Sequence, residues 1–309
     1  MKKDTLLKIA KYTVILLIFF FIIRYLYLNF NNINLREISF NSGFLLLSVL
    51  VYFVHLLFNA LIWHIITIQN HCAINVFEAI KLRIYADFGK YIPGKVFSYG
   101  ILLFSYEKKN IPKKNIAACS VQEFILSTLA AIIIALASIF FSGIKELVPY
   151  KYLFLGLAAG CFVFVYPPVL QFIMNVFFRI FKKEKILLTI SFGRVLITLL
   201  LFICTWLIFG WAFYFFINSF YALSVEHYFF ITGAFAIAGI IGFVSVFAPA
   251  GLGVREGVLI FTLSLVLTTA MSSLISLISR LWMTLSEILL LLIVFALDLI
   301  FRKRKLPGG

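Results

Sequence analysis

Charged residues are scarce in this sequence: 13% of its 309 residues are Asp, Glu, Lys or Arg, whereas 63% are hydrophobic. Soluble globular domains carry about 25% charged and about 45–50% apolar residues. No stretch of the chain has the composition of a soluble domain. We therefore expect residues 1–309 to form a single membrane domain of the all-α, polytopic class.

Motifs for redox, metal or nucleotide chemistry are also missing. The cysteines lie far apart, with no CxxC pair and no nearby histidine cluster: Cys72, Cys119, Cys161 and Cys204. This spacing indicates neither a disulfide framework nor a zinc site. Because the sequence also has no nucleotide-binding motif, no metal-ligand cluster and no close pair of acidic residues, we expect no cofactor and no enzymatic activity.

Acidic residues are few: 12 Asp and Glu accompany 27 Lys and Arg, which gives a net charge of +15. Such an excess can indicate nucleic-acid binding, but here the basic residues form short clusters beside apolar runs. The clusters are Lys2, Lys3, Lys8 and Lys11; Lys108, Lys109, Lys113 and Lys114; Arg179, Lys182, Lys183 and Lys185; and Arg302, Lys303, Arg304 and Lys305. Since loops rich in Lys and Arg stay in the cytoplasm, we expect a cell-membrane protein with cytoplasmic N- and C-termini and no nucleic-acid partner.

Long apolar runs predict membrane-spanning helices at about residues 6–28, 43–68, 115–141, 150–178, 192–217 and 272–301. Two interrupted stretches, 72–106 and 228–268, are predicted as re-entrant hairpins. The order span, span, hairpin, span then occurs twice, in repeat one (about 1–145) and in an inverted repeat two (about 146–305), as in many transporters. An alternative with the same parity has eight full crossings, with 228–247 and 254–268 as separate spans.

Each predicted hairpin contains a break rich in glycine and proline that also carries fixed charge. The first break reads GKYIPGKV at residues 89–96, and the second reads PAGLGVREG at residues 249–257. Irregular backbone at membrane depth is costly unless protein, water or ligand satisfies its N–H and C=O groups. Paired breaks in corresponding places of two halves are the best indication in a sequence of a transporter's binding site.

The first break is expected to bind an anion. Lys90 and Lys95 lie beside Pro93 and Gly94, where exposed backbone amides and helix N-termini can face a phosphate. The arm before the break is too charged to cross lipid alone, so protein must shield its charged residues: Glu78, Lys81, Arg83 and Asp87.

In the second break, Gly251 and Gly253 precede Arg255 and Glu256. The planar guanidinium of Arg255 can hold a phosphate or a carboxylate through two parallel bonds. We therefore expect these residues to bind substrate. The alternative is that Arg255 pairs with a carboxylate elsewhere, such as Glu287, and only stabilises the fold.

The last predicted span carries one polar stripe at helical spacing: Ser273, Ser276, Arg280, Thr284 and Glu287. Arg280 follows Pro249 at almost the same distance along the chain as Glu123 follows Pro93. The two halves thus place a charge at a similar relative depth. We expect these charges either to line the substrate path or to form a buried ion pair that ties the halves together.

The two breaks resemble the paired motifs of the flippase-like family that includes the membrane region of lysylphosphatidylglycerol synthetases. The similarity covers about residues 43–301. It implies a helical bundle that moves or binds polar-headed lipids, such as lysyl-phosphatidylglycerol or, in other members, hopanoids and lipids of glycan assembly. The sequence departs from the full synthetases because it has no cytosolic aminoacyl-transferase domain, so we do not expect it to synthesise lysyl-lipid.

These observations predict a protein that translocates a polar-headed, phosphate-bearing lipid between leaflets without nucleotide hydrolysis. The expected partner is a membrane lipid with an anionic or aminoacylated head group; association with a partner synthase or with further copies of the chain stays open. Two alternatives remain. One is a membrane enzyme that uses Glu123, Glu256 or Glu287 as a general base on a lipid-linked substrate, and the other is a lipid-binding subunit of a synthase.

Overall fold

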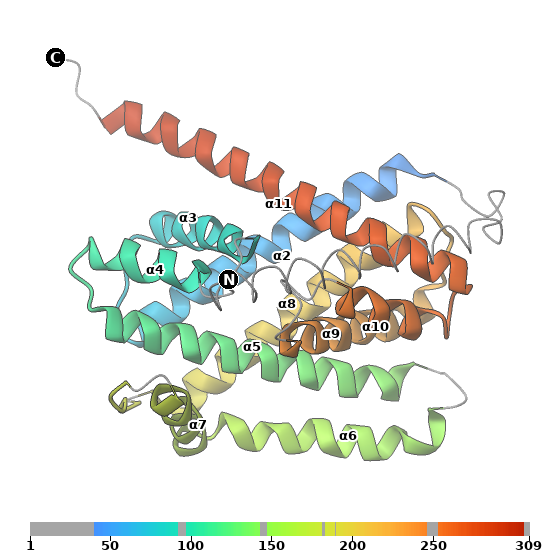
Figure 1. The fold of residues 1–309 in the computed structure, drawn as a ribbon, viewed down its shortest axis with the longest axis horizontal. Helices are drawn as coiled ribbons and strands as arrows, with labels where there is room; N and C mark the ends of the chain where they lie inside the picture. The colour runs from blue at the N-terminus through green and yellow to red at the C-terminus, as the bar shows by residue number, and fades with distance from the viewer. Residues whose placement is uncertain are drawn as a thin grey trace, which may run out of the picture.

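The computed structural model describes residues 40–91, 97–142, 147–180, 183–188, 190–245 and 253–305. In these segments all regular structure is helical and no strand occurs (Figure 1). This result confirms the all-α class. The predicted first span, residues 6–28, lies outside the described part of the chain.

Within the described residues, six helical segments are long and apolar enough to cross a membrane. Their bounds are Ser42–Gln69 (α2), Lys113–Phe141 (α5), Val148–Val165 (α6, Lys151–Gly160, with a 3-10 turn on each side), Phe192–Asn218 (α8), Val225–Val244 (α9, Tyr228–Val244, with a preceding 3-10 turn) and Thr269–Ile300 of α11 (Thr269–Lys305). The chain is therefore a multi-pass membrane protein, as its composition predicts.

The prediction of a single crossing over residues 150–178 is wrong. The helical segment ends at Val165, Tyr166 is extended with φ −61° and ψ 121°, and a new helix, α7 (Pro167–Ile180), follows. A residue before proline is pushed away from the α-helical region, and proline is tolerated in the first turn of a helix. Figure 1 shows α7 nearly end-on while α6 runs across the view, so the two helices point in different directions.

Pairs of helices occupy the regions predicted as hairpins. α3 (Val76–Asp87), followed by a 3-10 turn, packs beside α4 (Phe97–Glu107), and α9 packs beside α10 (Val254–Leu263). α3, α4 and α10 have 12, 11 and 10 residues, whereas a bilayer crossing needs about 20. In Figure 1 the α3–α4 pair extends toward one end of the bundle and the α9–α10 pair toward the other.

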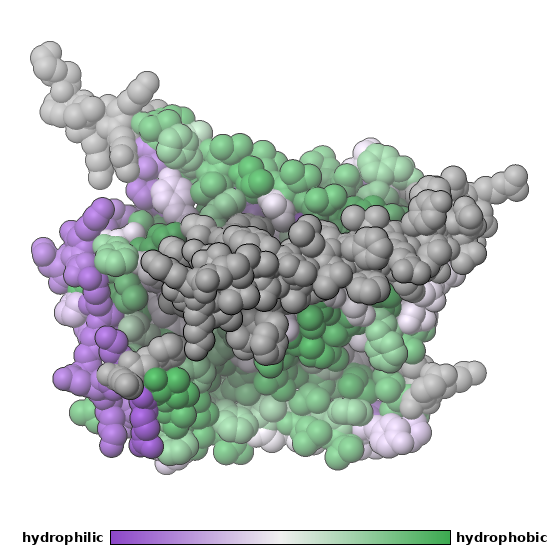
Figure 2. All heavy atoms as spheres, in the orientation of Figure 1, coloured by the Kyte–Doolittle hydropathy of each residue, from purple (hydrophilic) through white to green (hydrophobic). Residues whose placement is uncertain are grey.

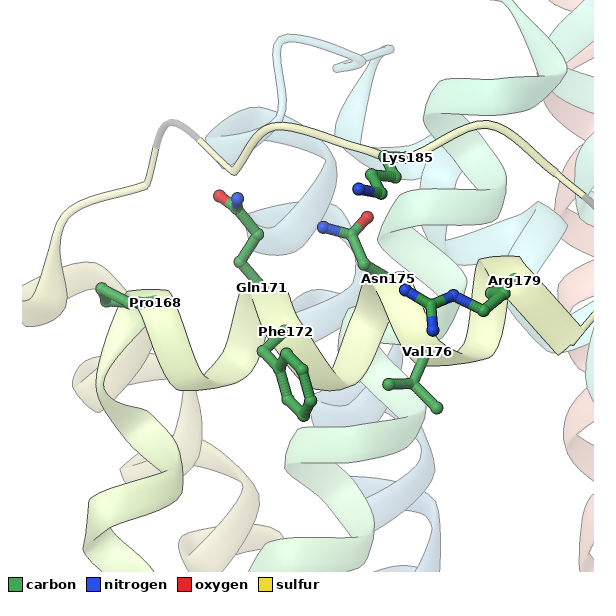
Figure 3. Close-up of a pocket in the computed structure, with 7 residues that line it drawn as sticks. All are labelled: Pro168, Gln171, Phe172, Asn175, Val176, Arg179 and Lys185. Carbon is green, nitrogen blue, oxygen red and sulfur yellow. The ribbon is translucent and has the colours of Figure 1, made fainter.

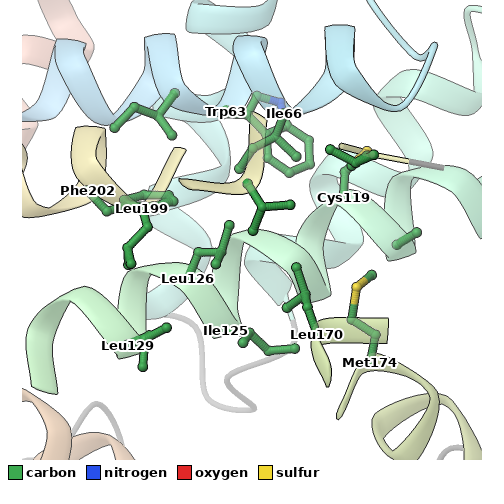
Figure 4. Packing of buried hydrophobic residues seen from close by; sticks show 14 of the residues in the cluster. Trp63, Ile66, Cys119, Ile125, Leu126, Leu129, Leu170, Met174, Leu199 and Phe202 are labelled. Carbon is green, nitrogen blue, oxygen red and sulfur yellow. The ribbon is translucent and has the colours of Figure 1, made fainter. Parts of the chain in front are cut away.

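The largest core cluster lies where α2, α5, α7 and α8 meet (Figure 4). Trp63, Leu126 and Phe202 are buried in it, and the indole N–H of Trp63 donates a hydrogen bond of 2.9 Å to the hydroxyl of Tyr106 on α4. Large apolar side chains are exposed on the outer faces of most helices. Figure 2 shows hydrophobic residues over much of this face and hydrophilic residues gathered at the end where α4 turns into α5. This distribution is the one expected for a bundle surrounded by lipid.

Two glycines of α9 allow neighbouring helices to approach closely. A Cβ at Gly233 would lie 1.8 Å from Oγ and 2.3 Å from Cβ of Ser138 on α5. A Cβ at Gly242 would lie 3.0 Å from the Cβ of Arg255 on α10. By contrast, a Cβ at Gly239 would come no nearer than 3.9 Å to Trp206 on α8. Close packing of α9 thus depends on glycine at the first two positions but not at the third.

We predict that Gly233→Ala destabilises the protein and Gly239→Ala does not. The added methyl group at position 233 overlaps Ser138, and overpacking of this kind typically costs about 1–3 kcal/mol. At position 239 there is room, so alanine gains only its helix propensity, up to about 1 kcal/mol. Melting temperatures in detergent compare the two variants. Ser138→Gly should rescue Gly233→Ala, and equal melting temperatures for all variants would contradict the close α5–α9 contact.

Candidate functional site

Within the second break, α10 begins directly after Gly253. Gly253 has φ 81°, a backbone conformation that favours glycine because a side chain there is strained. Its N–H donates a hydrogen bond of 2.7 Å to Oε2 of Glu256, three residues into the helix. The helix N-terminus therefore already holds an anion, namely a carboxylate from its own first turn.

Glu256 is buried and binds more than the start of α10. Its Oε1 accepts a 2.6 Å hydrogen bond from Nη1 of Arg280, and its backbone carbonyl accepts a 3.1 Å hydrogen bond from Ser276. Both partners come from the polar stripe of α11. Glu256 thus fixes the start of α10 against α11.

Arg255 lies beside Glu256 and Arg280, but only part of its hydrogen-bonding capacity is used. Its Nε is 3.3 Å from Oε1 of Glu256 without forming a hydrogen bond, and Nη1 points to the sulfur of Met283 at 3.7 Å. The guanidinium carbon lies 5.3 Å from the ring centre of Phe235. The side chain is only 14% exposed, yet Nε and Nη2 have no hydrogen-bond partner among the described residues. Buried donors without partners are rare because each is costly.

Arg255 also lies in a group of side chains in which positive charges outnumber negative ones. We call Arg255, Glu256 and Arg280 the second polar cluster. Two guanidinium groups share one carboxylate in this cluster, and the better geometry belongs to Arg280. Arg255 therefore contributes a positive charge that Glu256 does not fully neutralise, which makes it the group in the cluster best suited to bind an anion.

Glu287 lies further along the polar stripe of α11 and contacts α2. Its Oε1 accepts a 2.7 Å hydrogen bond from the hydroxyl of Tyr52, whose ring packs 5.0 Å from that of Trp282. The ion-pair partner of Arg255 in the described structure is Glu256 and not Glu287. Within the alternative in which Arg255 pairs with a carboxylate, the partner is therefore its sequence neighbour Glu256 on α10.

A corresponding cluster lies at the first hairpin. Arg83 on α3 donates from Nε to Oε1 of Glu123 on α5 at 3.0 Å and from Nη1 to Asp87, one helical turn along α3. Glu123 is buried, and its Oε2 has no hydrogen-bond partner among the described residues. We call Arg83, Asp87 and Glu123 the first polar cluster. It contains two carboxylates and one guanidinium, the reverse of the second cluster.

Of the two roles expected for Glu123 and Arg280, the ion pair that ties the halves together is not found, because each residue pairs within its own half. Each hairpin is instead tied to the next long helix: α3 to α5 by Arg83–Glu123, and α10 to α11 by Arg280–Glu256. The halves are joined at Lys81, whose ammonium lies 2.8 Å from Asp298 on α11. These pairs also shield the arm before the first break as expected, since Glu78 pairs with Lys109 at 2.5 Å.

Arg83 and Lys81 were recognised in the sequence only as charges that needed shielding. The spacing of Arg83 and Asp87 by four residues was the available signal, because such residues meet on one face of a helix. Four of the predicted site residues, Pro93, Gly94, Lys95 and Gly251, lie outside the described residues. Lys90 belongs to the 3-10 turn Phe88–Tyr91, and the position of its side chain lies outside the description.

We predict that Glu256→Gln destabilises the protein strongly. The change removes the carboxylate that Arg255 and Arg280 share, and removal of one partner from a buried pair typically costs about 3–5 kcal/mol. The matched control is Glu107→Gln, because Glu107 pairs with Lys113 at 2.9 Å but both side chains are about half exposed, a setting worth roughly 0–1 kcal/mol. The melting temperatures of the two variants measure the loss of stability, and an equal decrease in both would contradict the structural role of Glu256.

The sequence matches the family described as the lysylphosphatidylglycerol synthase TM region over residues 8–296, a range that contains both polar clusters. No curated protein and no solved structure gives a match. The resemblance seen in the two breaks is thereby confirmed. This chain belongs to the family of the lysylphosphatidylglycerol synthase transmembrane region.

Proposed function

We propose that this protein translocates a phosphate-bearing lipid between the leaflets of the membrane, and that Arg255 binds the head group. One observation carries the proposal: the guanidinium group of Arg255, whose side chain is 14% exposed, lies in an apolar bundle with two N–H positions that no described residue fills. Ionisable residues inside membrane-spanning regions are rare and mark functional sites such as substrate and ion pathways. The membership in a family that acts on membrane lipids supports a lipid as the ligand.

The geometry around Arg255 suits a phosphate in particular. Nε and Nη2 lie on one edge of the guanidinium fork, which matches two oxygens of a phosphate. Glu256 already holds Arg280 and the Gly253 amide at 2.6 and 2.7 Å, so the carboxylate beside Arg255 is fixed before a lipid arrives. A preformed site loses less free energy to ordering when it binds its ligand.

The two pairs of short helices also suggest how the chain is arranged in the membrane. We infer that α3–α4 and α9–α10 are re-entrant hairpins of two inverted repeats, which would bring the two breaks toward the middle of the membrane from opposite sides. Lys90 and Lys95 of the first break would then serve the same head group as Arg255. Both termini would lie in the cytoplasm. Transport would be passive or coupled to an ion gradient, and the chain would act as a transporter and not as an enzyme.

We predict that Arg255→Lys slows lipid translocation while the melting temperature stays nearly unchanged. An ammonium group keeps the charge beside Glu256 but lacks the planar fork. Loss of one charge-assisted bond is worth about 1.5–3 kcal/mol, or roughly 10- to 150-fold in affinity. The initial translocation rate of fluorescent phosphatidylglycerol in proteoliposomes, at lipid levels below saturation, measures the loss.

The matched control is Arg83→Lys. Arg83 is also a largely buried arginine on a hairpin arm, but its guanidinium bonds two carboxylates. Its substitution should lower the melting temperature and leave the translocation rate per folded molecule unchanged. If Arg255→Lys behaves like Arg83→Lys, the head-group role of Arg255 is rejected and Arg255 is a structural residue.

Topology is tested by cysteine labelling in intact cells. Single cysteines at positions 110 and 226 are introduced into a chain whose native cysteines are replaced by alanine. Asn110 lies between α4 and α5, and Glu226 lies in the 3-10 turn before α9. We expect an impermeant thiol reagent to label position 226 and not position 110. Labelling of position 110 from outside would contradict the inverted-repeat arrangement.

A further inference from the structure

Three rows of residues along the short helix α7, each repeating every four positions, differ in character. The first row, Leu170, Met174 and Phe178, is buried against the core. The second row is polar and consists of Gln171, Asn175 and Arg179. The third row, Phe172, Val176 and Ile180, is apolar but exposed, with Phe172 and Ile180 each 68% exposed. An exposed apolar row beside a polar one is typical of a helix that lies in the plane of a membrane surface.

The chain after α7 returns along the polar row. Asn175 accepts a 2.8 Å hydrogen bond from the Ile186 N–H and donates a 3.2 Å bond to the Ile186 carbonyl. Gln171 accepts a 2.9 Å bond from the Leu188 N–H. These bonds hold the returning segment in place beside a pocket of about 380 Å³ (Figure 3).

The pocket brings two cations together. In Figure 3 the side chains of Arg179 and Lys185 lie on either side of Asn175 and extend toward it. Neither has a carboxylate within 4 Å in the part of the chain that the structure describes. The nearby Glu184 forms an ion pair with Lys114 of α5, with 2.6 Å between its Oε2 and the Nζ of Lys114. The pocket therefore carries positive charge that its described surroundings do not neutralise.

Apolar groups also line this pocket. Pro168, Phe172 and Val176 line it together with the two cations, and Leu187 of the returning segment is 84% exposed. The preceding span ends at Val165, and Tyr166 follows it, a residue type enriched at membrane interfaces. α7 thus begins directly after a candidate membrane span, and its apolar row is exposed.

We propose that this pocket binds the phosphate of an anionic lipid in the leaflet at that surface, at a site separate from the Arg255 site. Arg179 and Lys185 would contact the phosphate, while the glycerol and first acyl carbons would lie against Phe172 and Val176. The apolar lining favours a lipid over free phosphate, because free phosphate would leave that lining exposed to water. The bound lipid would hold α7 in the membrane interface and fix the end of the α6 span.

Native mass spectrometry of the purified full chain tests this site by titration with phosphatidylglycerol and, separately, with phosphatidylcholine. The variant Arg179→Gln/Lys185→Gln removes both cations. Since one basic residue near an anionic lipid contributes roughly a fivefold factor, we expect affinity for one phosphatidylglycerol to fall about 25-fold. The charge-preserving swap Arg179→Lys/Lys185→Arg should retain most of the binding and shows that loss is not caused by misfolding.

The matched control is Lys108→Gln/Arg194→Gln, which removes the same charge from exposed positions outside the pocket. An equal loss in this control would overturn the proposal, as would equal binding of phosphatidylcholine or displacement of the lipid by millimolar inorganic phosphate. Repeating the titration in Arg255→Lys separates the two sites. The α7 site should bind as before, so failure of the translocation proposal would leave this result intact.

Discussion

A charged side chain inside a hydrocarbon layer is costly unless another charge or a hydrogen-bonding group compensates it. This constraint accounts for how the hairpins are held. Arg83 lies between Glu123 and Asp87, and Glu256 binds both Arg280 and the start of α10. In each case the pair joins a short helix to a long one.

Arg255 departs from this rule within the described residues. Its carboxylate neighbour is committed to better-placed donors, and it keeps two unfilled N–H positions in a nearly buried setting. A protein that only needed structural integrity would gain stability from an apolar residue here, because replacement of buried charge by hydrophobic side chains is often neutral or stabilising. A ligand that accepts hydrogen bonds from these N–H groups would explain why an arginine is buried at this position.

The sequence was most informative about where the helical backbone is interrupted. Glycine and proline in the two breaks predicted where helices stop, and Gly253 is found in the conformation that favours glycine. Partner choice was harder to predict. Arg83 and Glu123 are 40 residues apart in the chain, so their pairing depends on how α3 packs against α5, which periodicity does not reveal. The break at Tyr166 was in principle readable from Pro167 and Pro168, but apolar composition on both sides concealed it.

The two proposed sites have different places and roles: the Arg255 site would bind a lipid head group inside the membrane, and the α7 site would bind a lipid at its surface. Arg255 lies on a hairpin that is anchored by Glu256, whereas Arg179 and Lys185 lie on a helix whose exposed apolar row suits the interface. Both rely on guanidinium or ammonium groups that described carboxylates leave available, but only the first is buried. An anchored surface helix would give the α6 span a fixed end while the hairpins rearrange around a lipid.

Photo-crosslinking tests the central claim most directly, namely that a lipid phosphate reaches Arg255 inside the bundle. A phosphatidylglycerol analogue with a photoreactive group beside its phosphate is reconstituted with the protein, and peptide mass spectrometry locates the adducts. We expect adducts on the start of α10 and on the facing part of α11, and their loss in Arg255→Lys at equal amounts of folded protein. Adducts confined to outward-facing residues, with the same pattern in Arg255→Lys, would contradict the account.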